Sequence, residues 1–137
     1  MRTETPRIPP VSLDDLDEEA REIFARFGED EPLNIFRTLA RHPALLRRWL
    51  VFANHVLGKS TLPERERELL ILRIGWLCRA GYEWGQHVLI GLDSGLTEEE
   101  IQRIKAGPDA GGWSAGDRDL LLAVDELHRD AHVADAT

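Results

Sequence analysis

Residues 60–95 read STLPERERELLILRIGWLCRAGYEWGQHVLIGLDSG, and this stretch decides the fold. From Leu69 to Leu77 the side chains are apolar nearly all round a helical projection, which is typical of a central, buried helix. Ser60 or Thr61 is suited to cap this helix, and Pro63 fits its first turn. The stretch therefore predicts a buried helix around which the rest of the chain packs.

Three ionisable residues in this stretch form a candidate acid/base site. Glu83 and His87 are four residues apart, so they are neighbours on one helical face. Glu68 points inward from the buried helix, where burial should raise its pKa unless Arg73 or another cation compensates. A carboxylate and an imidazole near a buried second carboxylate are suited to proton transfer. A structural ion pair at Glu68 and an exposed surface contact between Glu83 and His87 are the alternative interpretations.

The rest of the chain has a helical pattern as well. Apolar residues recur at helical spacing and no segment alternates with period two, so we expect an all-α fold of about six to seven helices. The pattern breaks at Arg79–Gly81, and Thr97 and Ser114 are suited to cap the last two helices. A Pro-rich arm, 1–12, precedes a single expected domain, 13–137. The predicted helices are 13–27, 34–41, 43–57, one that runs from near Pro63 to Leu77, 82–93, 98–106 and one that follows Ser114.

The composition limits the classes of partner. The 25 acidic and 17 basic side chains give a net charge of −8, and the basic residues are interleaved with acids, so nucleic acid and anionic membranes are not expected partners. The longest apolar run, 69–78, is too short to span a bilayer. The first residues, MRTETPRIPP, lack the apolar core of a signal peptide, and we therefore expect a cytoplasmic protein.

Metal and disulfide chemistry have little support in the sequence. His128 and His132 have a spacing that can bind zinc, but no further histidine or cysteine accompanies them, so no metal site is predicted. Cys78 is a single cysteine, which rules out an internal disulfide. No glycine-rich phosphate loop follows a predicted strand.

The motifs LPERERELLILRIGW, YEWGQH and GLTEEEI resemble the carboxymuconolactone decarboxylase family, which shares its all-α fold with the alkylhydroperoxidase AhpD proteins. The resemblance extends over roughly residues 39–127. It implies an AhpD-like helical domain that self-associates as a trimer or hexamer, with sites near subunit contacts.

The redox branch of this family carries a Cys-x-x-Cys pair. Its glutamate falls on Glu68 and its histidine on His87, whereas its two cysteines fall on Ala80 and Glu83. Dithiol peroxide reduction needs both thiols. The resemblance therefore favours the decarboxylase branch, which uses no thiol pair and no cofactor. Peroxidase activity through Cys78 alone and a non-catalytic structural relative are the alternatives.

The resemblance implies cofactor-free decarboxylation, or related proton transfer, on a small carboxylated lactone or keto acid. In this interpretation the catalytic residues are His87, Glu83 and Glu68. His87 holds or delivers the proton, and Glu83 orients the imidazole from one turn earlier. Glu68 relays the proton or orients the ring from the neighbouring helix.

The expected substrate pocket is apolar with one cationic anchor. Trp76, Trp84 and Tyr82 are the predicted apolar lining, and they would favour a neutral, CO₂-like transition state. Arg73 is the predicted anchor for the substrate anion, and Arg79 is the other cation nearby. Arg47, Arg48 or Lys59, from another helix or another subunit, are the alternatives.

Overall fold

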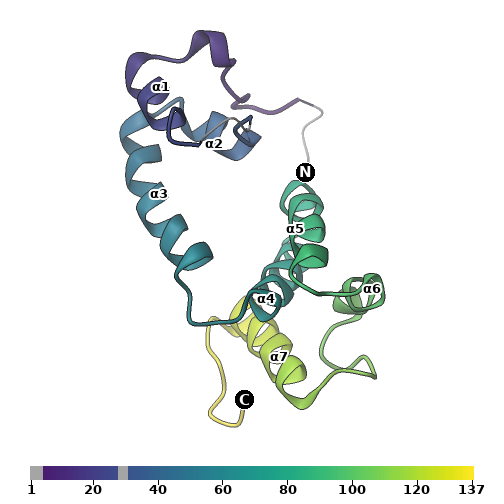
Figure 1. Ribbon diagram of the computed structural model, residues 1–137. Helices are drawn as coiled ribbons and strands as arrows, with labels where there is room; N and C mark the ends of the chain where they lie inside the picture. The colour runs from purple at the N-terminus through teal and green to yellow at the C-terminus, as the bar shows by residue number, and fades with distance from the viewer. Residues whose placement is uncertain (1–4, 28–30) are drawn as a thin grey trace. The chain divides into compact units, whose positions relative to one another are not determined.

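The computed structural model describes residues 5–27 and 31–137, and it is all-α, as predicted (Figure 1). In this part of the chain the elements are a 3₁₀ turn η1 (Leu13–Asp15) and helices α1 (Glu18–Phe24), α2 (Asn34–Leu39), α3 (Pro43–Gly58), α4 (Glu64–Leu77), α5 (Gly81–Asp93), α6 (Glu98–Ala106) and α7 (Ala115–Asp130). The chain divides into two compact units, Met1–Ser60 and Thr61–Thr137. The single domain expected over 13–137 stays a prediction.

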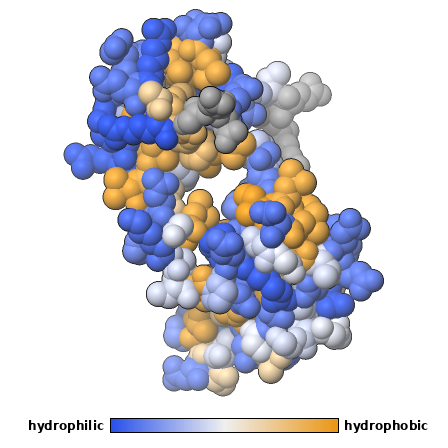
Figure 2. Space-filling model, viewed as in Figure 1, coloured by the Kyte–Doolittle hydropathy of each residue, from blue (hydrophilic) through white to orange (hydrophobic). Residues whose placement is uncertain are grey.

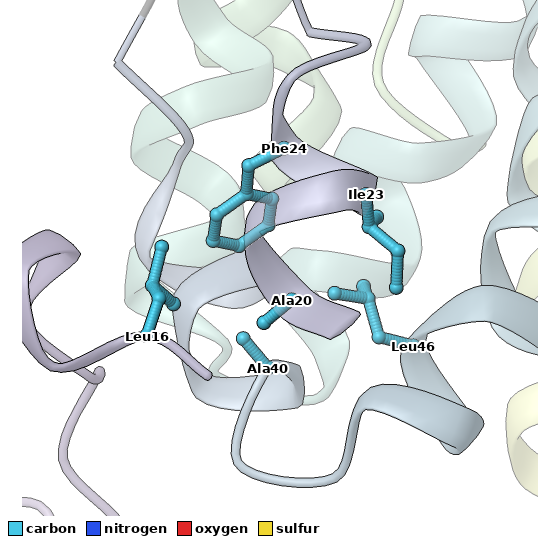
Figure 3. Packing of buried hydrophobic residues seen from close by; sticks show 6 residues of the cluster. All are labelled: Leu16, Ala20, Ile23, Phe24, Ala40 and Leu46. Atoms are coloured by element: carbon cyan, nitrogen blue, oxygen red, sulfur yellow. The ribbon is translucent and has the colours of Figure 1, made fainter. Parts of the chain in front are cut away.

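The first unit packs α1, α2 and α3 around a small apolar core. Figure 3 shows its buried side chains, which are Leu16, Ala20, Ile23, Phe24, Ala40 and Leu46. The continuous helix predicted over 13–27 is wrong, because the chain makes the 3₁₀ turn first and α1 begins only after Asp17. The Asp17 carboxylate accepts the backbone N–H of Ala20 at 2.8 Å, which caps a new helix at this point.

The third helix begins where its sequence predicts. Pro43 occupies the first turn, and the His42 side chain accepts the N–H of Leu45 at 3.3 Å. Leu46 and Ala53 are buried, whereas Val51 and Phe52 are exposed. This helix therefore has one face in the core and another, partly apolar, outside the core.

The second unit is organised around α4, which contacts α5, α6 and α7. Leu69 and Leu72 of α4 are fully buried, which confirms the central helix expected from the sequence. Their neighbours in this core are Leu96, Ile101, Ile104 and Leu121. The predicted cap is wrong, since Pro63 and not Ser60 or Thr61 occupies the N-cap position.

The predicted break after α4 is confirmed, and it turns the chain back so that α5 packs against α4. Arg79 takes a left-handed conformation with φ of 55°, and its N–H donates to the Trp76 carbonyl at 3.0 Å. The N–H of Ala80 donates to the Gly75 carbonyl at 2.8 Å. These two bonds form a Schellman C-cap.

A glycine allows the close packing of α5 on α4. A Cβ atom placed on Gly91 would lie 3.1 Å from Leu96 Cδ1, 3.3 Å from Leu72 Cδ1 and 3.7 Å from the Cβ of Glu68. The absent side chain therefore lets α5 approach α4 at the level of Glu68. No helix in the described ranges has the length and apolar character needed to cross a membrane.

Candidate acid/base site

Glu68 of α4 and His87 of α5 meet across the interface between the two helices. The Nδ1 atom of His87 lies 2.6 Å from Glu68 Oε2, and the two side chains are 17% and 1% exposed. The sequence predicts that Glu68 orients the histidine from the neighbouring helix, and the structure brings these two residues together. The pair thus combines a carboxylate shielded from water with an imidazole at the edge of the unit.

Arg67 is the cation that compensates the buried carboxylate. Its Nε donates to Glu68 Oε1 at 3.0 Å, so both oxygens of Glu68 are engaged. Burial raises the pKa of Glu68, but the hydrogen bonds from His87 and Arg67 outweigh this effect, and the pKa lies below its ordinary value. Glu68 is therefore ionised at neutral pH. The sequence predicts Arg73 or another cation for this role, and in the structure that cation is Arg67.

The ionised carboxylate determines which ring nitrogen of His87 carries a hydrogen. A carboxylate only accepts hydrogen bonds, so Nδ1 of His87 must be the donor. The other nitrogen, Nε2, makes no hydrogen bond to the described parts of the chain. The arrangement therefore presents Nε2 as the atom that can take up or release a proton.

Glu83 does not contact His87 in the way the spacing predicts. Its side chain is exposed, and within residues 5–27 and 31–137 the hydrogen bond of His87 goes to Glu68 and not to Glu83. A spacing of four residues brings two side chains near each other, but the buried acid of another helix offers a stronger acceptor. The catalytic role expected for Glu83 stays a prediction.

Arg73 has structural contacts on every side. Its Nε and Nη2 donate to the two carboxylate oxygens of Asp125 at 2.6 and 2.7 Å, and its Nη1 donates to the carbonyls of Ile104 and Lys105 at 2.8 and 3.2 Å. Gly107 packs against the guanidinium, and a Cβ there would lie 2.5 Å from Nη2. Through these hydrogen bonds Arg73 joins α4 to α6 and α7. Because its donors are occupied, these contacts do not fit the predicted role of substrate anchor.

A second arginine makes a similar cross-link at the start of α4. Arg65 donates to Asp117 Oδ1 at 2.8 Å and also to Glu100. The hydrogen bond from Arg65 lowers the pKa of Asp117. Asp117 lies 52 residues and Glu100 35 residues away in the sequence, so no local pattern predicts the cross-link.

The predicted apolar lining is only partly assembled. The rings of Trp76 and Trp84 are 5.4 Å apart at an angle of 59°, so these two residues do come together. Tyr82 is exposed and makes no ring contact with either within the described residues. Lys105, which the sequence analysis did not single out, places its Nζ 5.4 Å from both indole rings.

Three further features do not involve the Glu68–His87 pair. A surface pocket of about 390 Å³ in the first unit is lined by Glu19, Ala44, Arg47, Arg48 and Val51. Cys78 is exposed at the C-cap of α4. Among the residues that the structure describes, no three His, Cys, Asp or Glu side chains group as they would around a metal ion.

The family model of the carboxymuconolactone decarboxylases matches residues 43–126, which is more than half of the chain. The chain belongs to the carboxymuconolactone decarboxylase family. The match runs from the start of α3 into α7, and it includes both Glu68 and His87. Searches of the curated proteins and of the solved structures gave no match.

Proposed function

We propose that this carboxymuconolactone decarboxylase family protein carries out cofactor-free acid/base chemistry, with His87 as the catalytic proton carrier. The reaction we favour is decarboxylation of a small carboxylated lactone or keto acid, or a related proton transfer. The 2.6 Å hydrogen bond between His87 and the buried, ionised Glu68 carries the proposal. The family match over the same residues supports it.

The proposed step needs one proton and no cofactor. The bond between the substrate carbon and its carboxylate breaks, the electron pair enters the conjugated system as an enolate, and CO₂ leaves. The imidazolium of His87 then donates its Nε2 proton to the carbon, and the neutral ring recovers a proton from water.

Glu68 acts as a positioning residue in this scheme. Its ionised carboxylate holds the proton on Nδ1 and stabilises the positive charge of the imidazolium. Glu83 has a smaller proposed part, in which its charge, one helical turn before His87, contributes through solvent to the electrostatic field around the site.

The test is turnover by the full chain and its matched histidine variants. A panel of carboxylated lactones and β-keto acids is incubated with the protein in D₂O, and CO₂ release and deuterium incorporation are followed. We expect turnover of at least one compound, and we expect His87→Gln to lose about 10² to 10⁴-fold of the rate. His128→Gln, which changes an exposed histidine of α7, is the control and should keep the wild-type rate. Equal rates for His87→Gln and the wild type would contradict the proposal.

The same preparation separates the alternatives. A single-thiol peroxidase replaces our proposal if the protein consumes peroxide, releases no CO₂, and stops consuming peroxide in the Cys78→Ser variant. Because Cys78 is exposed, this variant is an informative control. If neither reaction occurs, the protein is a non-catalytic relative.

We also propose that the protein self-associates. Figure 2 shows apolar side chains gathered on the surface of α5, where Leu89 is 67% exposed and Ile90 is 41% exposed. Val51 and Phe52 of α3 are exposed as well. Large apolar patches on a protein surface commonly mark interaction sites. Sedimentation velocity should detect an oligomer that Leu89→Asp weakens, and a monomer at every concentration would contradict this proposal.

A further inference from the structure

Three helices of the second unit meet around the ammonium group of Lys105. This residue is on α6, and its Nζ lies 5.4 Å from the ring centroids of Trp76 on α4 and Trp84 on α5. An ammonium near the face of an indole is attracted to the electrons of the ring. The two indoles therefore fix the position of the Lys105 charge.

The charge of Lys105 is not neutralised by an acid. Its Nζ donates to the amide oxygen of Gln102 at 2.6 Å, and within residues 5–27 and 31–137 it forms no ion pair. By contrast, Arg65 and Arg73 of α4 each bond to carboxylates. An ammonium has three N–H donors, of which Gln102 uses one. Lys105 thus retains donors for an anion.

We propose that Lys105 is the specificity-determining anchor for an anionic oxygen of the substrate, with Trp76 and Trp84 as the surface for a flat, conjugated body. This inference rests on the proposed function for its catalytic meaning, since Trp84 lies three residues before His87 and is its neighbour on α5. Trp76 is 44% exposed, whereas Trp84 is partly buried against the core, so a ligand from solvent reaches the pair mainly at Trp76. Lys105 takes the role that the sequence assigned to Arg73.

The anchored oxygen belongs to a carboxylate that the substrate keeps. If Lys105 held the carboxylate that leaves as CO₂, it would stabilise the ground state more than the transition state and slow the reaction. A retained carboxylate is bound equally in both states, and it fixes the reacting carbon relative to His87. The substrate class is therefore a planar, conjugated acid whose anchoring carboxylate does not react.

Binding of a planar acid and its neutral amide tests this inference. The probes are trans-cinnamate and cinnamamide, with affinities from calorimetry and the site from ¹⁹F NMR of protein labelled with 5-fluorotryptophan. The four tryptophan signals are assigned by single Trp→Phe changes. We expect cinnamate to shift the signals of Trp76 and Trp84 and to leave those of Trp49 and Trp113 in place.

The variants isolate the charge of Lys105. Lys105→Met should weaken cinnamate binding about tenfold or more and leave cinnamamide binding unchanged, because a hydrogen bond to a charged group is lost only with the acid. Lys105→Arg should keep most of the affinity, since it retains the charge and the indole contact. Lys59→Met, the change at the other lysine of the chain, should keep the wild-type affinity. Circular dichroism checks that each variant is folded.

Failure of the anchor and failure of the proposed function give different results. Cinnamate should bind His87→Gln as tightly as the wild type, because the measurement needs no turnover. Wild-type affinity in folded Lys105→Met, loss of affinity in Lys59→Met, or absence of cinnamate binding at the two tryptophans would overturn the anchor. None of these results bears on whether His87→Gln loses turnover, so the proposed function is tested separately.

Discussion

Two buried charges on α4, five residues apart, have opposite surroundings. The guanidinium of Arg73 bonds to Asp125 and to two backbone carbonyls, so its hydrogen-bonding capacity is used in the fold. The carboxylate of Glu68 bonds to Arg67 and to His87, and the second nitrogen of His87 has no hydrogen bond to any residue that the structure describes. A buried charge whose hydrogen bonds all go to other parts of the fold holds helices together. A buried charge that is hydrogen-bonded to an imidazole near the surface can instead support proton transfer.

The largest effect on stability should come from Arg73→Met. This change leaves Asp125 and two carbonyls without their buried partner, and the free energy of unfolding should fall by about 3–5 kcal/mol. Urea unfolding followed by circular dichroism measures it. Arg118→Met, which removes the exposed Arg118 with its 3.7 and 3.9 Å pairs, is the control and should change stability by less than about 1 kcal/mol. A loss at Arg73 no larger than that of the control would show that its bonds are not structural.

The helix contact that brings Glu68 to His87 should be sensitive to one methyl group. Gly91→Ala places a Cβ against Leu96 and Leu72, and we expect a loss of about 1–3 kcal/mol in urea unfolding. Gly85→Ala on the same helix meets nothing within 4 Å and should be stabilising by about 0.4–1 kcal/mol. Equal effects of the two changes would mean that α5 does not approach α4 closely at Gly91.

Removing the Glu68 charge should cost stability in a way that depends on pH. At neutral pH, Glu68→Gln weakens the hydrogen bonds that Glu68 accepts from Arg67 and His87. We expect the free energy of unfolding to fall by about 1–3 kcal/mol. The pKa of Glu68 in the folded protein lies below the ordinary 4.5, so its contribution is present above pH 4.5 and is lost as the pH falls through the folded pKa.

Urea unfolding at a series of pH values compares the wild type with Glu68→Gln. The difference in unfolding free energy should shrink as the pH falls below about 4.5. A difference that grows over that acidic range would have the opposite sign and would contradict the ionised carboxylate.

The smallest effect should come from Glu83→Gln. This side chain is exposed and is not bonded to His87, so unfolding by urea should change by less than about 0.5 kcal/mol. The hydrogen position on the His87 ring should also stay as in the wild type, which ¹⁵N NMR reports. A shift of the hydrogen between the ring nitrogens would show that Glu83 and not Glu68 orients the histidine.

The sequence predicted much of the fold because local signals mark its helices. The apolar run of α4, the break at Arg79 and the cap at Thr97 each depend on neighbouring residues, and all three are present in the structure. The interruption after Leu13–Asp15 was missed because the apolar spacing continues across it, while the Asp17 cap overrides the periodicity.

The candidate site was only partly accessible to sequence reasoning. Glu68 and His87 were found because an acid in an apolar helix is unusual and because the family resemblance joined it to a histidine. The partner of Arg73 lies 52 residues away, and the position of Lys105 depends on how α6 packs, so neither could be read from spacing. The signal for Lys105 is its contact with two tryptophans, and this contact forms only when α4, α5 and α6 pack together.

The most direct test of the central claim is the position of the hydrogen on the His87 ring. A long-range ¹H–¹⁵N NMR spectrum resolves the five histidines of the chain, and His87→Gln assigns the relevant signal. Neutral His87 should carry its hydrogen on Nδ1, bonded to Glu68, with Nε2 unprotonated. A neutral ring with its hydrogen on Nε2, or a spectrum that Glu68→Gln leaves unchanged, would contradict the account.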